Sequence, residues 1–203
     1  MEFTPTTVAI LYWSTLLASV IAGASTVLDC RRKQFDLFGV LMVAFCTALG
    51  GGTLRDLILD RKVFWVADVS NLVYVWGGAL LAFYIARRIE LKPHRFEVPD
   101  AISLGLFTVA GTHAAMMLDN HWLVASFMGV ITGVAGGILR DILLNEEPQV
   151  FKGEVYATAC WIGSLLYTFM WHRVDLNLAA FVTAITVTLL RLAALRWNWT
   201  LPK

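Results

Sequence analysis

The chain has 203 residues, of which 58% are hydrophobic and only 15% are charged. Soluble domains carry about 25% charged residues, so this composition excludes an ordinary water-soluble domain and indicates a chain whose solvent is lipid. The formal net charge of +1 gives no reason to expect nucleic acid or a strongly acidic partner.

Apolar stretches of membrane-spanning length recur along the chain. A helix needs about 20 apolar residues to cross the hydrocarbon core of a bilayer. The sequence therefore predicts an all-α, polytopic membrane protein with seven transmembrane helices, forming a single domain over residues 1–203. The spans are predicted at Val8–Leu28, Leu37–Leu54, Ser70–Ala86, Ala101–Leu118, Leu123–Leu139, Val155–Trp171 and Leu176–Leu195.

Lys and Arg are unevenly distributed between the two sides of this topology. Arg55 and Arg140 are set aside because each abuts an apolar stretch. One side then carries three basic residues, Arg61, Lys62 and Arg173. The positive-inside rule places the richer side in the cytoplasm, which predicts an inner (plasma) membrane protein with its N-terminus outside and its C-terminus inside. The richer side carries eleven basic residues: Arg31, Arg32, Lys33, Arg87, Arg88, Lys92, Arg95, Lys152, Arg191, Arg196 and Lys203.

A six-residue motif occurs twice. Gly51-Gly52-Thr53-Leu54-Arg55-Asp56 recurs at an offset of 85 as Gly136-Gly137-Ile138-Leu139-Arg140-Asp141, with five of six positions identical. Each copy lies in the second span of a three-span unit. We therefore predict repeat one over 7–91, repeat two over 99–172 and an additional span over 175–196. Because three is odd, the second unit crosses the membrane in the opposite sense, and inverted repeats place a permeation path at their interface.

The glycines of the motif weaken the two helices that contain it. Gly50–Gly52 and Gly136–Gly137 each lower helix propensity by about 1 kcal/mol per residue relative to alanine. We expect the second and fifth spans to break there and to free backbone carbonyls, which are ligands for permeant K⁺ or Na⁺. The alternative is that the glycines only allow close helix packing.

An arginine and an aspartate follow each glycine motif. A charged side chain at membrane depth costs about 2.5–3.5 kcal/mol, so it is expected to face the protein interior. We predict that the Arg55-Asp56 and Arg140-Asp141 pairs approach each other and line the path. The alternative is an ordinary interfacial pair, but the duplication favours the functional interpretation. The predicted pore-lining and gating residues are Gly50, Gly51, Gly52, Arg55, Asp56, Gly136, Gly137, Arg140 and Asp141.

These motifs, together with the run Asp100-x₄-Gly105-x-Phe107-x₃-Gly111, resemble prokaryotic relatives of the trimeric intracellular cation (TRIC) channels. The resemblance extends over 7–195 and departs from the family pattern at Ala135, where the second copy has no third glycine. It implies a homotrimer with one K⁺-permeable, weakly selective pore in each subunit. It also implies that the second and fifth spans bend at the glycines, with membrane lipid nearby.

Two other function classes are weighed. Some bacterial members of the family look like transporters of small amino acids, glycine in particular, and a helix end can hold a carboxylate as readily as a cation. An intramembrane enzyme is not expected, because the chain has no HExxH or GxSxG motif. The four histidines and three cysteines show no metal-ligand spacing, so we expect no metal or other cofactor.

Overall fold

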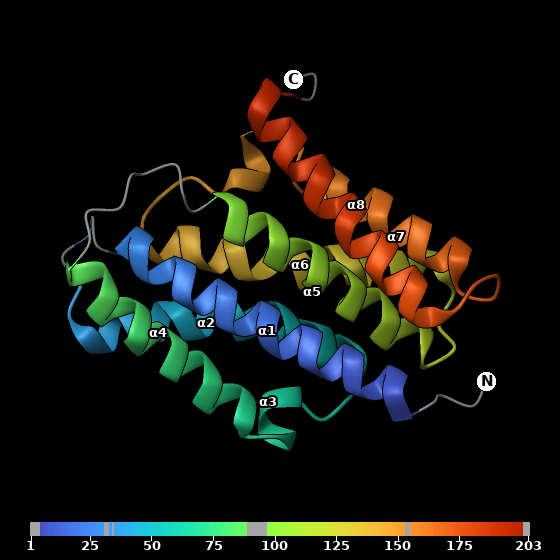
Figure 1. Cartoon of the computed structure of the whole chain (residues 1–203), viewed down its shortest axis with the longest axis horizontal. Coiled ribbons are helices and arrows are strands. Elements are labelled where there is room, and N and C mark those ends of the chain that lie inside the picture. The colour runs from blue at the N-terminus through green and yellow to red at the C-terminus, as the bar shows by residue number, and fades with distance from the viewer. Residues whose placement is uncertain (1–4, 31–32, 34, 89–96, 153–154, 201–203) are drawn as a thin grey trace.

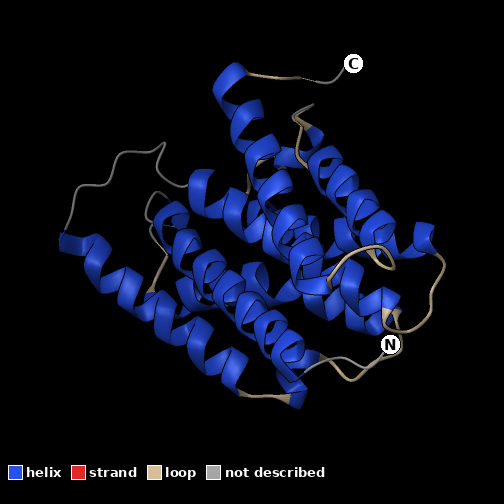
Figure 2. Ribbon diagram, turned by 45° about the vertical axis from the view of Figure 1, so that its right-hand side comes forward, coloured by secondary structure: helices blue, strands red, loops and turns tan. Residues whose placement is uncertain are grey.

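The computed structural model describes residues 5–30, 33, 35–88, 97–152 and 155–200. The regular elements among these residues are helices, which confirms the all-α prediction (Figure 2). Several predictions lie outside the described residues: the end of repeat one after residue 88, and the basic residues Arg31, Arg32, Lys92, Arg95 and Lys203.

Each of the seven predicted spans corresponds to one long helix. The structure adds two short elements that were not predicted, α3 after α2 and η3 after α6, which lie at equivalent places in the two halves. The elements in chain order are α1 (Pro5–Cys30), α2 (Leu37–Ile58), α3 (Phe64–Ala67), α4 (Ser70–Arg88), α5 (Glu97–Met116), α6 (Trp122–Leu143), η3 (Gln149–Phe151), α7 (Ala157–Met170) and α8 (Leu176–Trp197).

The helices differ in how clearly they are built to cross a membrane. Among the described residues, α1, α2, α6 and α8 are long and apolar enough to span the hydrocarbon by themselves. Apolar stretches in α4 and α7 are shorter, and α5 contains Glu97, Asp100 and His113. Large apolar side chains such as Trp13, Phe38 and Phe181 are exposed at 59–69%. An outward surface of this kind is typical of a protein that faces lipid.

The two three-helix units run in opposite directions. In Figure 1, α1 runs from the right, near the N-terminus, to the left, and α4 follows the same direction. In the second unit, α5 and α7 run from left to right, and α8 returns toward the upper left. The central helices α2 and α6 pack directly against each other.

The repeat extends to the ends of the central helices. Both α2 and α6 contain 22 residues, and their N-caps, Asp36 and His121, are 85 positions apart. Asp36 accepts a hydrogen bond from the Gly39 N–H at 2.7 Å, and His121 caps its own helix through Nδ1. After each helix the chain turns through a left-handed residue, Asp60 or Asn145, again 85 apart. The same local signals therefore start and stop both helices.

Two glycines allow α2 and α6 to touch backbone to backbone. A Cβ atom at Gly51 would collide with the carbonyl oxygen of Thr132, and a Cβ at Gly136 would collide with the carbonyl oxygen of Thr47. The two contacts are reciprocal, because each residue pair is the other shifted by 85 positions. This close approach is the packing role of small residues in membrane helices.

The expectation that α2 and α6 break at their glycines is wrong. Both helices are uninterrupted through Gly50–Gly52 and Gly136–Gly137. The glycines are instead in contact with neighbours: an added Cβ would meet Leu139 at Gly50, Phe64 at Gly52 and the Tyr156 hydroxyl at Gly137. Packing against these groups offsets the low helix propensity of glycine, so the helical backbone hydrogen bonds are kept.

We predict that Gly51→Ala destabilises the protein by about 3 kcal/mol, because a methyl group at the crossing must push two helix backbones apart. Gly77→Ala is the matched control, since Gly77 lies inside α4 and a Cβ there has no neighbour within 4 Å. Its stability should be unchanged or raised by up to about 1 kcal/mol. Thermal unfolding of both variants in one detergent tests this. Equal melting temperatures for the two variants would contradict the packing role.

Candidate functional site

The two Arg-Asp pairs lie on opposite sides of the point where α2 and α6 cross. Gly51 lies against Thr132 and Gly136 against Thr47, so the helices are antiparallel and Arg55 is level with Met128. Arg140 lies twelve residues beyond that level, roughly 18 Å along the helix. The prediction that the two pairs approach each other is therefore wrong. They belong to opposite ends of the molecule.

Each Arg-Asp pair has the same local geometry. The Nε of Arg55 donates to Oδ1 of Asp56 at 2.8 Å, and the Nε of Arg140 donates to Oδ1 of Asp141 at 2.9 Å. The other carboxylate oxygen of each aspartate accepts a backbone N–H eight residues later, from Phe64 at 2.9 Å and from Gln149 at 3.0 Å. Each aspartate thus orients its arginine and ties down the loop that follows the helix. All four charged residues are buried.

The second copy joins a larger charge cluster. Arg140 Nη1 donates to Oδ1 of Asp100 on α5 at 2.9 Å, and its Nε lies 3.8 Å from Oδ2 of Asp29 on α1. Three carboxylates from three helices therefore surround one guanidinium. Because charges buried at low dielectric attract strongly, the cluster holds α1, α5 and α6 together at this end.

The first copy lies beside a cavity instead. Among the described residues, Arg55 forms an ion pair with Asp56 alone, and its guanidinium lies 5.5 Å from the centre of the Phe64 ring. It reaches a cavity of about 620 Å³ between α1, α2, α3, α4 and α5. We call this cavity the vestibule. Its lining consists of Leu11, Tyr12, Thr15, Arg55, Arg61, Lys62, Phe64, Ala67, Asp68, Asn71, Ala110, His113, Ala114, Met117 and Leu118.

The charges of the vestibule are mostly positive. In its lining, Arg55 is buried, and Arg61 and Lys62 are exposed. The described carboxylate in the lining is Asp68, which accepts a hydrogen bond from the Tyr12 hydroxyl at 2.7 Å. This bond and a second one from the Ser70 backbone hold the pKa of Asp68 below its ordinary value, so it is ionised at neutral pH.

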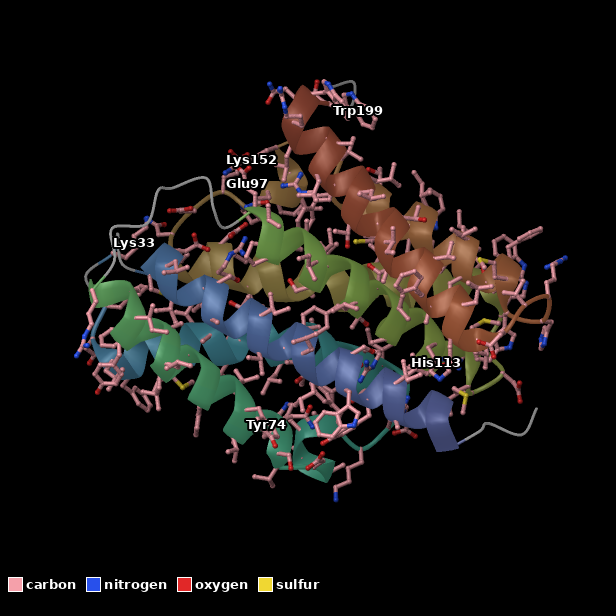
Figure 3. The ribbon with its side chains drawn as sticks, viewed as in Figure 1. Lys33, Tyr74, Glu97, His113, Lys152 and Trp199 are labelled. Carbon is pink, nitrogen blue, oxygen red and sulfur yellow. The ribbon has the colours of Figure 1, made fainter. Side chains whose placement is uncertain are left out.

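The opposite wall of the vestibule carries His113, whose Nδ1 lies 2.9 Å from the Tyr167 hydroxyl on α7. His113 is labelled in Figure 3 at the end of α5, on the side of the molecule that also holds the N-terminus. His113, a residue of the vestibule lining, thus lies at the end of the molecule opposite to Lys33 and Glu97.

The structure places the nine predicted residues in three environments. Arg55 alone lines the vestibule, and Asp56 lies behind it. Arg140 and Asp141 belong to the charge cluster at the other end. The five glycines lie at or beside the helix crossing and are absent from the vestibule lining: Gly50, Gly51, Gly52, Gly136 and Gly137.

Sequence reasoning did not identify the partners of these residues. Asp100 and Asp29 reach Arg140 from positions 40 and 111 residues away, and Tyr12 reaches Asp68 across 56 residues. One signal was present: the first half has no aspartate corresponding to Asp100, so the two arginines could not have equivalent partners.

We predict that Arg140→Gln destabilises the protein by about 3–5 kcal/mol, because it leaves three carboxylates together without their cation. Arg55→Gln should cost about half of that or less, since it leaves only Asp56, next to a vestibule that water can enter. Unfolding in a common detergent measures both, with the exposed Arg173→Gln as control. A larger loss for Arg55→Gln than for Arg140→Gln would overturn the assignment of the cluster.

One family model matches the chain twice. A family model described as "Glycine transporter" matches residues 12–87 and again residues 97–172. The UPF0126 inner membrane protein YadS of Escherichia coli K12 is 38% identical over 197 residues, which is 95% of this chain and 95% of that protein.

Solved structures of TRIC channels also match nearly the whole chain. A prokaryotic TRIC channel crystallised in 0.5 M KCl has a TM-score of 0.87 and 26% identity, covering 95% of this chain and 99% of that one. The TRIC trimeric intracellular cation channel orthologue from Rhodobacter sphaeroides has a TM-score of 0.85 and 33% identity, covering 97% of this chain and 100% of that one. These neighbours are channels and not enzymes, in agreement with the prediction that this chain is not an enzyme. The chain is a multi-pass inner-membrane protein that belongs to the UPF0126 family and matches the family model described as "Glycine transporter", and it is a prokaryotic relative of the TRIC channels.

Proposed function

We propose that the protein is a passive cation channel that conducts K⁺ across the inner membrane. The observation that carries this proposal is the likeness, over nearly the whole chain, to structures described as TRIC cation channels. The identities of 26–33% and the TM-scores of 0.85–0.87 support a shared activity in addition to a shared fold. Permeant K⁺ or Na⁺ needs no tightly bound cofactor.

The proposed topology has seven crossings, with two inverted three-helix repeats followed by α8. Three observations support it: the opposite directions of the two units in Figure 1, the helix caps repeated at an offset of 85, and the family model that matches twice. We place the N-terminus outside and the C-terminus in the cytoplasm on the basis of the positive-inside rule. Reporter fusions at the C-terminus test this orientation, and activity of a periplasmic reporter there would reverse it.

We propose that ions enter through the vestibule, pass Arg55 and continue along the interface of the two repeats toward the Arg140 cluster. Inverted-repeat proteins place their paths at such interfaces. The crossing at Gly51 and Gly136 separates the vestibule from the Arg140 cluster. The structure therefore has the features of a closed state, with an open cavity at one end and tightly paired charges at the other.

The resemblance also implies a homotrimer with lipid close to the glycine motifs, and one neighbour is described as trimeric. A trimer with one pore in each subunit is part of the proposal. The mass of the detergent-solubilised protein tests it: three times 22.6 kDa supports the trimer, and a monomer mass contradicts it.

A transporter of a small amino acid such as glycine is the second candidate. The description of the family model favours it. The vestibule provides a further argument, because a buried arginine suits the carboxylate of a zwitterion better than it suits a cation. The structural neighbours outweigh these arguments, but the two activities are separable by experiment.

Single-channel recording from purified protein in planar bilayers tests the proposal. We expect discrete currents that reverse near the K⁺ equilibrium potential in a KCl gradient, and near zero when K⁺ on one side is replaced by Na⁺. Liposomes prepared from the same protein are assayed for counterflow of labelled glycine. Electrical silence combined with saturable glycine counterflow would replace the channel by the transporter.

We predict that Arg55→Gln raises the single-channel K⁺ conductance. A fixed positive charge about 8 Å from a passing cation repels it by roughly 2 kcal/mol at an effective dielectric constant of about 20, so removing it should increase conductance by up to about thirtyfold. Arg173→Gln is the matched control, because Arg173 is an exposed cation outside the vestibule lining. An unchanged conductance in Arg55→Gln would remove this arginine from the path.

A further inference from the structure

The guanidinium of Arg55 uses only part of its hydrogen-bonding capacity. Its Nε donates to Asp56, but within the described residues neither Nη1 nor Nη2 has a hydrogen-bond partner. Arg55 is only 6% exposed, yet it lines the vestibule and both Nη atoms remain accessible to solvent. The N–H groups of both Nη atoms are therefore available to a ligand that enters the vestibule.

Two contacts fix the orientation of this guanidinium. Asp56 holds the Arg55 Nε through Oδ1, and its Oδ2 holds the Phe64 backbone N–H. The Phe64 ring lies 5.5 Å from the guanidinium carbon and packs on Gly52, where an added Cβ would collide with the ring. The Nη groups are thus positioned before a ligand binds, which lowers the cost of binding.

The second copy of the motif shows what such a guanidinium binds. Arg140 makes the same Nε bond to Asp141, and its Nη1 donates to Oδ1 of Asp100 at 2.9 Å. A carboxylate from α5 thus occupies the Nη side of the second arginine. The two copies share the bond at Nε and differ at the Nη side.

The offset of 85 relates α1 to α5 as well as α2 to α6. A Cβ at Gly23 on α1 would contact Ala48 on α2. A Cβ at Gly133 on α6 would contact Thr108 on α5. Thr108 lies 85 positions after Gly23, and Gly133 lies 85 positions after Ala48. The two helix pairs therefore pack in corresponding registers.

This register identifies the residue of the first half that corresponds to Asp100. It is Thr15, which lies 85 positions earlier and also lines the vestibule. The Thr15 hydroxyl donates to the Leu11 carbonyl of its own helix at 2.8 Å. The first half therefore brings a threonine, and not a carboxylate, to the place from which Asp100 reaches Arg140.

The walls of the vestibule favour an organic carboxylate. Much of the lining is apolar, including Leu11 on α1 and Ala110 and Ala114 on α5. Apolar walls lower the local dielectric constant and strengthen the attraction between a guanidinium and a carboxylate. Such pairs are often bidentate, with two parallel N–H···O bonds. The volume of about 620 Å³ is within the range of small-molecule sites.

We propose that the Nη groups of Arg55 bind the carboxylate of a small aliphatic ligand, in the position that Asp100 takes at Arg140. The site goes beyond the channel proposal, because binding is measurable whether or not the protein conducts ions. In the amino-acid transporter alternative, the same site would hold the carboxylate of the substrate. An organic acid and an amino acid share this carboxylate, and the experiment separates them.

Thermal unfolding of the purified full-length protein in one detergent tests the site, with acetate or glycine added and chloride at equal ionic strength as the baseline. We expect acetate to raise the melting temperature by about 3–6 °C at roughly ten times its Kd. Arg55→Gln should abolish the rise, and Arg55→Lys should reduce it because an ammonium lacks the planar pair of Nη groups. Arg173→Gln, which removes an exposed arginine outside the vestibule lining, should keep the rise.

A second variant tests the correspondence with Asp100. Thr15→Asp supplies Arg55 with a carboxylate from the protein itself, so it should abolish the response to acetate. Thr15→Asn is the comparison, because asparagine has the same size as aspartate without the charge. The loss of response should be larger in Thr15→Asp than in Thr15→Asn.

The two ligands assign the source of the carboxylate. A rise with acetate alone supports a site for organic acids, and a rise with glycine supports a site that accepts amino acids. The absence of a rise with both ligands in wild type overturns the site, as does an equal rise in wild type and Arg55→Gln. So does a full acetate response in Thr15→Asp. None of these results decides the channel proposal, which depends on the recorded currents.

Discussion

The structure depends on the backbone contact between α2 and α6. Gly51 and Gly136 let each helix meet a threonine carbonyl of the other, and a single added carbon at either position would separate them. Because the contact is reciprocal, it sets the register of the two helices as well as their distance. That register decides where Arg55 and Arg140 lie. The two glycines, which have no side chain, thus determine where the charged side chains of Arg55 and Arg140 lie.

The two arginines show how one motif acquires two environments. A charge buried in a membrane protein has to be paired or reach water, because the cost of leaving it isolated exceeds the stability of most single contacts. Arg140 is surrounded by Asp141, Asp100 and Asp29, so its charge is paired with carboxylates from three helices. Arg55 has Asp56 and a vestibule beside it. The difference lies in the flanking helices α1 and α5 rather than in the motif.

The uninterrupted helices change the argument for permeation. Freed carbonyls at the glycines are not available as cation ligands, because α2 and α6 keep their helical structure there. The channel proposal instead depends on the structural neighbours and on the vestibule that ends at Arg55. The vestibule carries more positive than negative charge, which opposes the entry of cations. A fixed arginine beside the path is a barrier to cations, and its removal is expected to increase conduction.

Local signals in the sequence determined the helices. Runs of apolar residues predicted each long helix to within a few residues at its ends, and the motif at an offset of 85 predicted two related units. These features depend on neighbours in the chain, so they are legible from the sequence. Only the tertiary structure decided what the motif contacts. The contacts of Arg140 with Asp100 and Asp29, and the bond between Tyr12 and Asp68, join residues 40 to 111 positions apart. The glycines were ambiguous for the same physical reason: a glycine weakens a helix by itself, but another backbone packed against it restores the stability, and the sequence does not name that second backbone.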